Sequence, residues 1–535
     1  MRIEDGKPIA EPECGPVRGA LEGDGEVAVF KGIPFAEAER WAPPAPVSPW
    51  TDVRDATSDG PIAHQYAVLF DVFMDNLVNG LGLPRWRKRA LKAGFKLDRR
   101  KQHEDCLSLG VRAPVGAEGL PVMVWIHGGN HTDGSGSDPL YATNVLPEQG
   151  CVLVTINYRL GLLGFFAHPE LSAESPDRVS GNQGMLDQIA GLRWVRDNIA
   201  AFGGDPDNVT IFGESAGGMS VLHLMCSPGA RGLFHRAIAQ SPSHTGLWLH
   251  LRRTALDWDT AENAGRAVAD RLVGRGPGQL ERLRALPVEA LQELYRTDEE
   301  LARYFFPLAD GVVLPEPPMS VFARGGQADV PLMIGDTARE ASLFAADMNP
   351  GGSELKGRPV TPFELRQALI RSYGSSIDVD ELLAAFPGLG ELEPDAVEEH
   401  ISAHMFGAHV EHVADLHTEA GHSVHRYRFA SEPPSKKQTI GAFHAMDVIA
   451  LFSSPLPLVK WGPGSEELSA EMAERWVSFA RDGKPAASGR GDWTAYDPAA
   501  PSRYVLDRNG SGMAQVPRSP GVAVMRRRFD RLSAG

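Results

Sequence analysis

Ten residues, 209–218, combine a candidate nucleophile with a backbone that could present it. The segment reads Val-Thr-Ile-Phe-Gly-Glu-Ser-Ala-Gly-Gly, so that Gly213 and Gly217 lie two residues either side of Ser215 in a G-x-S-x-G pattern. Apolar, β-branched residues precede the serine, and apolar residues with helical spacing follow it. The pattern predicts a strand that turns sharply into a helix and exposes the serine hydroxyl at the turn. Glycine is required beside such a turn because the neighbouring backbones leave no room for a Cβ atom.

A serine nucleophile also needs donors for the negative charge that develops on the attacked oxygen. The amide of Ala216, at the start of the predicted helix, is one such donor. A second is expected from a glycine-rich loop that follows an early strand. Residues 127–131, His-Gly-Gly-Asn-His, follow the apolar run 122–126. We therefore expect the amides of Gly129 and Asn130 to complete an oxyanion hole with Ala216.

Residue types alone do not select the base. Eight histidines follow position 340, and most of them lie where the sequence predicts a helix: His400, His404, His409, His412, His417, His422, His425 and His444. Only the last lies in a glycine-bounded loop beyond a late apolar run. Two pairs within residues 400–412 have the spacing of metal ligands on a helix, but no acidic partner completes a recognisable site, so we expect no metal.

Composition excludes several classes of function. Of the 535 residues, 42% are apolar and 23% are charged, the balance of a soluble globular enzyme. A net charge of −16 argues against nucleic-acid binding, which needs a basic surface. The apolar stretches are too short or too polar to predict a transmembrane segment. Four scattered cysteines and a polar N-terminal segment favour a cytoplasmic location.

The elements expected around Ser215 alternate as in an α/β protein. Short apolar runs predict buried strands of a mainly parallel sheet at 122–126, 152–156, 209–212, 235–240, 331–334 and 424–429. Helical character follows at 183–199, 254–302, 361–421 and 468–479, and the last helix should end at Gly483. No repeat or low-complexity linker divides the chain. Residues 1–535 are therefore predicted to form one α/β domain with helical insertions.

Residues 66–103 differ from the rest in composition. Apolar residues recur at every fourth position from Leu69 to Leu81, which predicts a helix, and a second helical stripe follows. Between Arg85 and Lys101 there are nine Lys or Arg and one Asp, a local charge of +8. Three interpretations stay open: a helical pair that covers the main domain, a lid that favours anionic substrates, or a peripheral surface for a membrane or a partner.

Many segments, in the same order along the chain, resemble those of the type B carboxylesterase and cholinesterase family, which includes bacterial esterases of the para-nitrobenzyl type. The similar segments lie between about Gly15 and Trp493 and include residues 17–19, 32–35, 104–107, 124–129, 157–159, 184–188, 202–206 and 212–218. The resemblance implies the α/β-hydrolase fold, a large and mostly parallel central sheet flanked by helices. It also implies a triad in the order Ser, Glu, His.

The resemblance places the acid and the base. Residues 335–344 are similar to the acid loop of the family, which makes Glu340 the acid, and residues 441–447 are similar to its histidine loop, which makes His444 the base. Asp336 and Asp447 remain alternative acids. In the family a cysteine near position 63 pairs with the counterpart of Cys106, whereas here position 63 is alanine.

The chain also departs from the family in its candidate substrate pocket. The family usually has a third glycine and an aromatic residue where this chain has Asn130 and His131. Asparagine tolerates positive φ, so the backbone donor should survive, and two polar side chains would face a polar substrate. Trp248, Phe305 and Phe344 lie in segments that resemble the walls of the acyl pocket, although each could equally be core.

Together these features predict a serine hydrolase that cleaves small-molecule carboxylic esters through an acyl-enzyme and favours polar or anionic esters. The chemistry requires no metal or organic cofactor. Two alternatives are an interfacial lipase with residues 66–103 as its lid, and a non-catalytic binding protein similar to cholinesterase-like adhesion proteins. The joint presence of Ser215, Glu340 and His444 argues against the second. The chain is expected to be a monomer or a homodimer.

Overall fold

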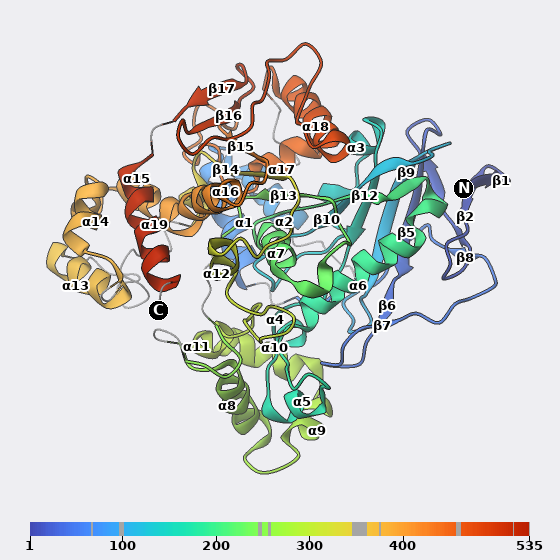
Figure 1. Ribbon diagram of the computed structural model, residues 1–535, viewed down its shortest axis with the longest axis horizontal. Coiled ribbons are helices and arrows are strands. Elements are labelled where there is room, and N and C mark those ends of the chain that lie inside the picture. The colour runs from blue at the N-terminus through green and yellow to red at the C-terminus, as the bar shows by residue number, and fades with distance from the viewer. Residues whose placement is uncertain are drawn as a thin grey trace.

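An eleven-stranded sheet runs through the molecule, with the strand that leads to Ser215 at its middle (Figure 1). The computed structural model describes residues 1–65, 68–95, 101–243, 249–254, 258–344, 361–373, 376–455, 462–516 and 518–533. From one edge to the other the strands are β17 (Gly512–Gln515), β16 (Ser502–Leu506), β15 (Val424–Phe429), β14 (Leu332–Thr337), β13 (Arg236–Gln240), β12 (Gly204–Glu214), β10 (Leu120–Ile126), β11 (Val152–Ile156), β9 (Ser108–Pro114), β5 (Val27–Pro34) and β4 (Ala20–Glu22).

The seven strands from β11 to β16 are parallel, and the outer strands at both edges are antiparallel. All six predicted strands are present, which confirms the mainly parallel sheet. The carboxyl ends of parallel strands meet at one edge of a sheet, where α/β proteins bind ligands. Ser215 follows β12, Glu340 follows β14 and His444 follows β15, so the three candidate residues all emerge at that edge.

Both faces of the sheet are covered, because alternate side chains of the apolar strands point to opposite sides. On one face Val124 and Ile211 belong to the larger core, which includes residues of α6 (Gln183–Asn198), α7 (Ala216–Cys226), α16 (Ala408–Glu419) and α19 (Pro520–Ser533). On the other face Trp125 and Phe212 pack with residues of α17 (Met446–Leu451) and α18 (Ser465–Asp482). The long helix α18 ends at Gly483 in the left-handed conformation, as predicted.

Further helices surround this centre (Figure 1). They are α3 (Val145–Glu148), α4 (Gly161–Gly164), α5 (Pro169–Glu174), α8 (Ala261–Val273), α9 (Gln279–Arg284), α10 (Val288–Thr297), α11 (Glu299–Ala302), α12 (Pro318–Ala323), α13 (Pro362–Tyr373), α14 (Val379–Ala385) and α15 (Pro394–Ser402). A π-helical segment, η8 (Ala403–Gly407), joins α15 to α16. Such segments are rare and often lie at functional sites.

The N-terminal part forms small sheets as well as one edge of the large one. Strands β1 (Arg2–Glu4), β2 (Lys7–Ala10), β3 (Val17–Arg18) and β8 (Arg54–Asp55) make a four-stranded sheet, and β6 (Ala36–Glu37) pairs with β7 (Ala45–Pro46).

The basic insertion folds as two helices, α1 (Val68–Gly80) and α2 (Arg85–Phe95), as its periodicity predicts. Trp86 on α2 is 62% exposed. Within the described part of the chain, no helix combines the length and the apolar character that crossing a membrane requires.

Candidate active site

Ser215 occupies the turn between β12 and α7. Its φ and ψ are 56° and −121°, and holding a non-glycine residue in such a sparsely populated region costs about 1–3 kcal/mol. Backbone hydrogen bonds impose this conformation: the Ser215 amide donates to Gln240 O at 2.9 Å, and the Ser215 carbonyl accepts from the Met219 amide at 2.8 Å. The side chain is only half-buried, so the strained turn leaves the hydroxyl accessible.

Two glycines allow β10 to pass directly beside this turn. A Cβ atom would lie 2.5 Å from the carbonyl oxygen of Ile126 if placed on Gly213, and 2.0 Å from it if placed on Gly217. Gly128 also lies close to the turn, since a Cβ atom there would lie 2.7 Å from the Glu214 carbonyl oxygen and 3.3 Å from Ser215 Cβ. These close approaches confirm that the turn has no room for a Cβ atom at either glycine, and they place the end of β10 against the serine.

The loop after β10 contains three successive residues with positive φ. Gly129, Asn130 and His131 have φ values of 102°, 55° and 56°. The next two amides close the turn by donating to Gly129 O at 3.0 and 2.9 Å. Among the residues that the structure describes, the amides of Gly129, Asn130 and Ala216 have no acceptor. This edge of the sheet therefore offers unused backbone donors beside Ser215.

Glu340 and His444, 104 residues apart in the chain, are in direct contact. Glu340 Oε2 lies 2.6 Å from His444 Nδ1. The other carboxylate oxygen of Glu340 accepts hydrogen bonds from Ser241 Oγ and from the Thr337 amide, both at 2.6 Å. The Arg339 amide also donates to the Ala442 carbonyl at 3.0 Å, which ties the two loops together. A carboxylate so held can fix the ring orientation of the histidine.

Glu214, the residue before the serine, contacts the other nitrogen of the same ring. Its Oε1 lies 3.1 Å from His444 Nε2, so carboxylates flank the imidazole on both sides. Burial alone would lower the pKa of His444, but the charges of Glu214 and Glu340 raise it to about 9. Burial raises the pKa of Glu214, whereas the positive charge of His444 lowers it, so the carboxylate and the imidazolium stabilise each other's charged forms. No hydrogen bond joins Ser215 Oγ to His444 in the described chain, and apo structures often lack this contact.

The contact between Glu214 and His444 was not predicted from the sequence. The sequence did contain a signal for this contact, because it places the carboxylate of Glu214 next to the nucleophile at the end of a predicted buried strand. Burying such a group is costly unless it is paired or neutralised.

The alternative acids are engaged elsewhere. Asp336 accepts two hydrogen bonds from the guanidinium of Arg428, at 3.0 and 2.6 Å. Asp447 accepts from Gln240 Nε2 at 2.9 Å and from the Tyr427 hydroxyl at 2.8 Å. Of the three carboxylates considered from the sequence, the structure places Glu340 against the histidine.

The predicted pocket residues lie in different environments. His131 is 0% exposed, and its Nε2 lies 3.1 Å from Ser220 Oγ on α7. Phe305 is 2% exposed and belongs to the main core. Phe344 is half-buried, with its ring 5.6 Å from that of His444, whereas Trp248 lies outside the described residues.

Two aromatic residues near these loops were not predicted. Phe306 is half-buried, and its ring lies 6.2 Å from that of His131. Phe406, in the π-helical segment, lies 4.8 Å from the ring of His444. The sequence signal for Phe306 was its place beside Phe305, but the sequence does not show which of the two rings faces the core. For Phe406 there was none, because a single π-turn has no clear sequence pattern.

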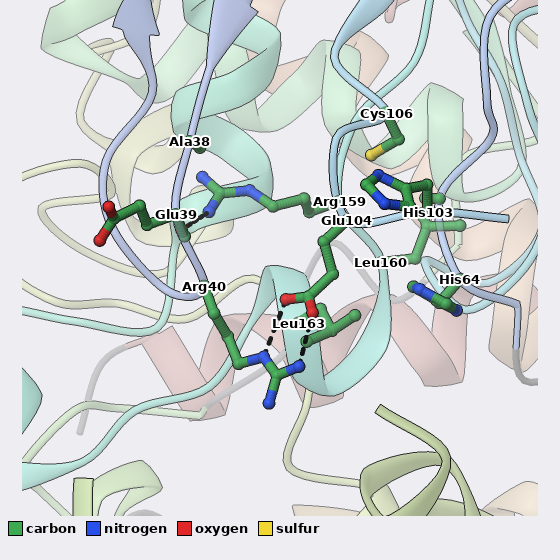
Figure 2. Close-up of a pocket in the computed structure, with 11 residues that line it drawn as sticks. Ala38, Glu39, Arg40, His64, His103, Glu104, Cys106, Arg159, Leu160 and Leu163 are labelled. Atoms are coloured by element: carbon green, nitrogen blue, oxygen red, sulfur yellow. Dashed lines mark hydrogen bonds and ion pairs between the residues drawn. The ribbon is translucent and has the colours of Figure 1, made fainter. Parts of the chain in front are cut away.

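A separate small pocket lies where the family resemblance would place a disulfide (Figure 2). Arg40 donates to both carboxylate oxygens of Glu104 on its wall, at 2.8 and 2.5 Å. Ala63 and Cys106 both line it, and burial raises the pKa of the Cys106 thiol to about 12. In the described part of the chain, no group of three or more His, Cys, Asp or Glu side chains is arranged to hold a metal ion.

Comparisons with known proteins agree with this architecture. The chain matches the carboxylesterase family over residues 6–524. It is 31% identical over 519 residues to the fumonisin B1 esterase of Sphingopyxis macrogoltabida, with 93% of this chain and 86% of the relative covered. It is 33% identical over 525 residues to the para-nitrobenzyl esterase of Bacillus subtilis (strain 168), with 93% and 94% covered.

The chain is also similar to solved structures of carboxylesterases. A structure of PNB esterase has a TM-score of 0.77 at 30% identity, with 97% of this chain and 99% of the other covered. A Geobacillus stearothermophilus carboxylesterase has a TM-score of 0.78 at 31% identity, with the same coverage of both chains. The chain therefore belongs to the carboxylesterase family and is a carboxylic ester hydrolase with the α/β-hydrolase fold.

Proposed function

We propose that the chain hydrolyses small-molecule esters through an acyl-enzyme on Ser215, with His444 as general base and Glu340 as the acid that orients it. The observation that carries the proposal is the 2.6 Å contact between Glu340 Oε2 and His444 Nδ1, because it fixes the ring through Nδ1 and assigns proton transfer to the other nitrogen, Nε2, which lies beside Glu214. In the first half-reaction His444 takes the proton of Ser215 Oγ while the oxygen attacks the ester carbonyl carbon.

The tetrahedral intermediate collapses by breaking the bond to the alcohol, which leaves with the proton from His444. Water then attacks the acyl-enzyme with the same base, and Ser215 regains its proton as the acid departs. The amides of Gly129, Asn130 and Ala216 stabilise the oxyanion in both steps. Loss of a single oxyanion donor typically costs about 10²–10³ in turnover.

A kinetic comparison tests the assignment of the nucleophile. Ser215→Ala should reduce kcat for a neutral activated ester by a factor of about 10⁴ or more, because triad members act as a unit. Ser227→Ala, just beyond the far end of α7, provides the matched control and should retain activity. Ser215→Ala protein that folds and turns over at more than a few per cent of the wild-type rate would refute the proposed nucleophile.

We further propose a preference for polar or anionic esters. Asn130 in the oxyanion loop carries a half-buried amide side chain, and the basic helix α2 carries four cationic residues between positions 85 and 89. The names of the relatives refer to different esters, a fumonisin and a para-nitrobenzyl ester, so substrate choice must come from this chain's own pocket.

The test of this preference compares esters with and without a carboxylate on the acyl group. If α2 acts as a lid over the substrate entrance, replacing Arg87, Lys88 and Arg89 with glutamine should raise KM selectively for the acidic ester. The expected change is about 3- to 10-fold, corresponding to about 1 kcal/mol for screened charges. An unchanged ratio of the two KM values would remove the lid hypothesis. A sharp rise in activity above the solubility limit of an ester would instead favour an interfacial lipase.

A further inference from the structure

The helix α1 and the turn after it pack on two loops of the candidate active site. We call residues 337–344 the acid loop and residues 438–446 the histidine loop. A separate apolar cluster joins them, and its buried members come from the insertion and from these loops alone: Met74, Leu77, Leu81, Leu343, Ile440 and Phe443. We call this cluster the apolar seam. It holds the insertion on the two loops that carry Glu340 and His444.

Hydrogen bonds reinforce the seam on both loops. Asn76 Nδ2 donates to the carbonyl oxygen of Leu343 in the acid loop at 2.9 Å. The amide of Thr439 in the histidine loop donates to the carbonyl oxygen of Gly80 at 3.0 Å. The last carbonyls of a helix have no partner within the helix, so the histidine loop supplies one. Each loop is thus tied to α1 by a polar contact as well as an apolar one.

The fit between α1 and the histidine loop is tight at Gly80. Alanine stabilises a helix relative to glycine by about 1 kcal/mol, so a glycine in the last turn needs a reason. A Cβ atom on Gly80 would lie 2.2 Å from Ile440 Cγ2. Beyond the helix, a Cβ atom on Gly82 would lie 2.5 Å from the backbone of Lys437. The insertion therefore packs closely against the Ile440 side chain of the histidine loop and against the backbone that immediately precedes this loop.

An aromatic contact links α1 to the imidazole itself. The ring of Phe73 lies 5.7 Å from the ring of Phe344, which lies 5.6 Å from the ring of His444. The opposite side of the acid loop is held by α15, because the Ala341 amide donates to Ser402 Oγ at 2.9 Å. The segment that carries Glu340 is therefore fixed between α15 and α1.

We propose that α1 is a positioning element that fixes the acid loop against the histidine loop, with Asn76 as its polar contact to the acid loop. This inference rests on the proposed triad. It assigns the insertion a role in catalysis that differs from a lid or a docking surface. When α1 is displaced, Glu340 loses its fixed distance from His444 Nδ1, so the ring is less well oriented for the proton transfer from Ser215. The loss should appear in kcat more than in KM.

The test compares the same substitution at a contact position and at an exposed position of one helix. Asn76→Ala removes the contact to the acid loop, whereas Asn79→Ala changes an exposed side chain of α1. Both replace asparagine by a better helix former, so their effects on the isolated helix match. We expect kcat to fall about 10-fold or more in Asn76→Ala, since small misplacements of reacting groups are costly. Asn79→Ala should remain within twofold of wild type.

The pH profile separates positioning from simple stability. In Asn76→Ala, a carboxylate that is less close to the imidazole raises its pKa less, so the acidic limb of kcat/KM should move to lower pH. A purely structural contact would lower Tm without moving the limb. Folded Asn76→Ala with wild-type kcat and an unmoved limb would overturn the proposal. Activity that survives Ser215→Ala would instead refute the triad, so the two failures are distinguishable.

A second pair of variants keeps the inference falsifiable if Asn76→Ala does not fold. Gly80→Ala should press on Ile440 and lower kcat. Ile440→Leu removes the Cγ2 methyl group that the new Cβ atom would meet. The double variant should therefore recover activity relative to Gly80→Ala alone. Additive losses in the double variant would show that the contact between α1 and the histidine loop does not control the reaction.

Discussion

Replacing Glu214 by glutamine should change the pH dependence of the enzyme in a defined direction. The carboxylate lies 3.1 Å from His444 Nε2, and Glu340 holds the other nitrogen at 2.6 Å. Glu214, Glu340 and Asp447 all raise the pKa of this imidazole, which reaches about 9 against an ordinary value of 6.5. Glutamine has nearly the same shape and carries no charge, so it removes one of these contributions and leaves the burial that lowers the pKa.

The magnitude follows from the charges. A net rise from 6.5 to about 9 is worth about 3 kcal/mol, at 1.36 kcal/mol for each pKa unit. Two close carboxylates provide most of it against the cost of burial, so losing Glu214 should lower the pKa of His444 by at least about one unit. The base must be neutral to accept a proton, and activity is therefore lost as the pH falls through this pKa. The acidic limb of kcat/KM should move down by at least about one pH unit.

The same substitution should lower the plateau at high pH. Glu214 also stabilises the imidazolium that forms in the transition state, so its loss should reduce the limiting rate by about 10-fold, or 1.4 kcal/mol. The assay measures kcat/KM for a neutral ester between pH 5 and 10, and the reaction is monitored by titrating the acid as it is released. The control is Glu118→Gln, because Glu118 is exposed and lies just before the amino end of β10, away from the candidate site. A limb that stays at the wild-type pH in Glu214→Gln would refute the electrostatic argument.

Two further predictions concern the backbone of the site. Gly217→Ala should destabilise the protein by more than about 4 kcal/mol, the exceptional range for a single substitution, because its Cβ atom would lie 2.0 Å from a backbone oxygen; Gly229→Ala, with its nearest atom at 3.5 Å, should be mild in the same urea titration. His131→Phe and Ser220→Ala should each lower kcat, because their contact braces the strained oxyanion loop. The double variant should be no worse than either single variant, whereas fully additive losses would show that the two side chains act separately.

Much of the architecture could be predicted from local patterns. Buried parallel strands appear in the sequence as short apolar runs, and the elbow at Ser215 requires glycines at fixed spacing, so both can be predicted from the sequence alone. The helix stop at Gly483 was predicted for the same local reason. The short edge strands β16 and β17 were missed, because their register depends on pairing with distant segments that no local pattern records.

The site was harder to predict than the fold. The selection of His444 and Glu340 came from resemblance, since eight histidines were available and the position of a loop above a sheet edge is a tertiary property. Glu214 is next to the nucleophile in the sequence, but its contact with the imidazole of His444 depends on the tertiary fold. Phe305 and Phe306 differ by one position, and which one meets the core depends on the packing of a loop.

Covalent labelling of the nucleophile tests the central claim most directly. Wild-type protein treated with a fluorophosphonate should lose its esterase activity in step with the appearance of one adduct, located by peptide mass spectrometry on Ser215. Labelling should be slower by about 10²-fold or more in His444→Ala, because the hydroxyl then lacks its general base. Complete inactivation with the adduct on another residue, or full labelling at the wild-type rate without His444, would contradict the account.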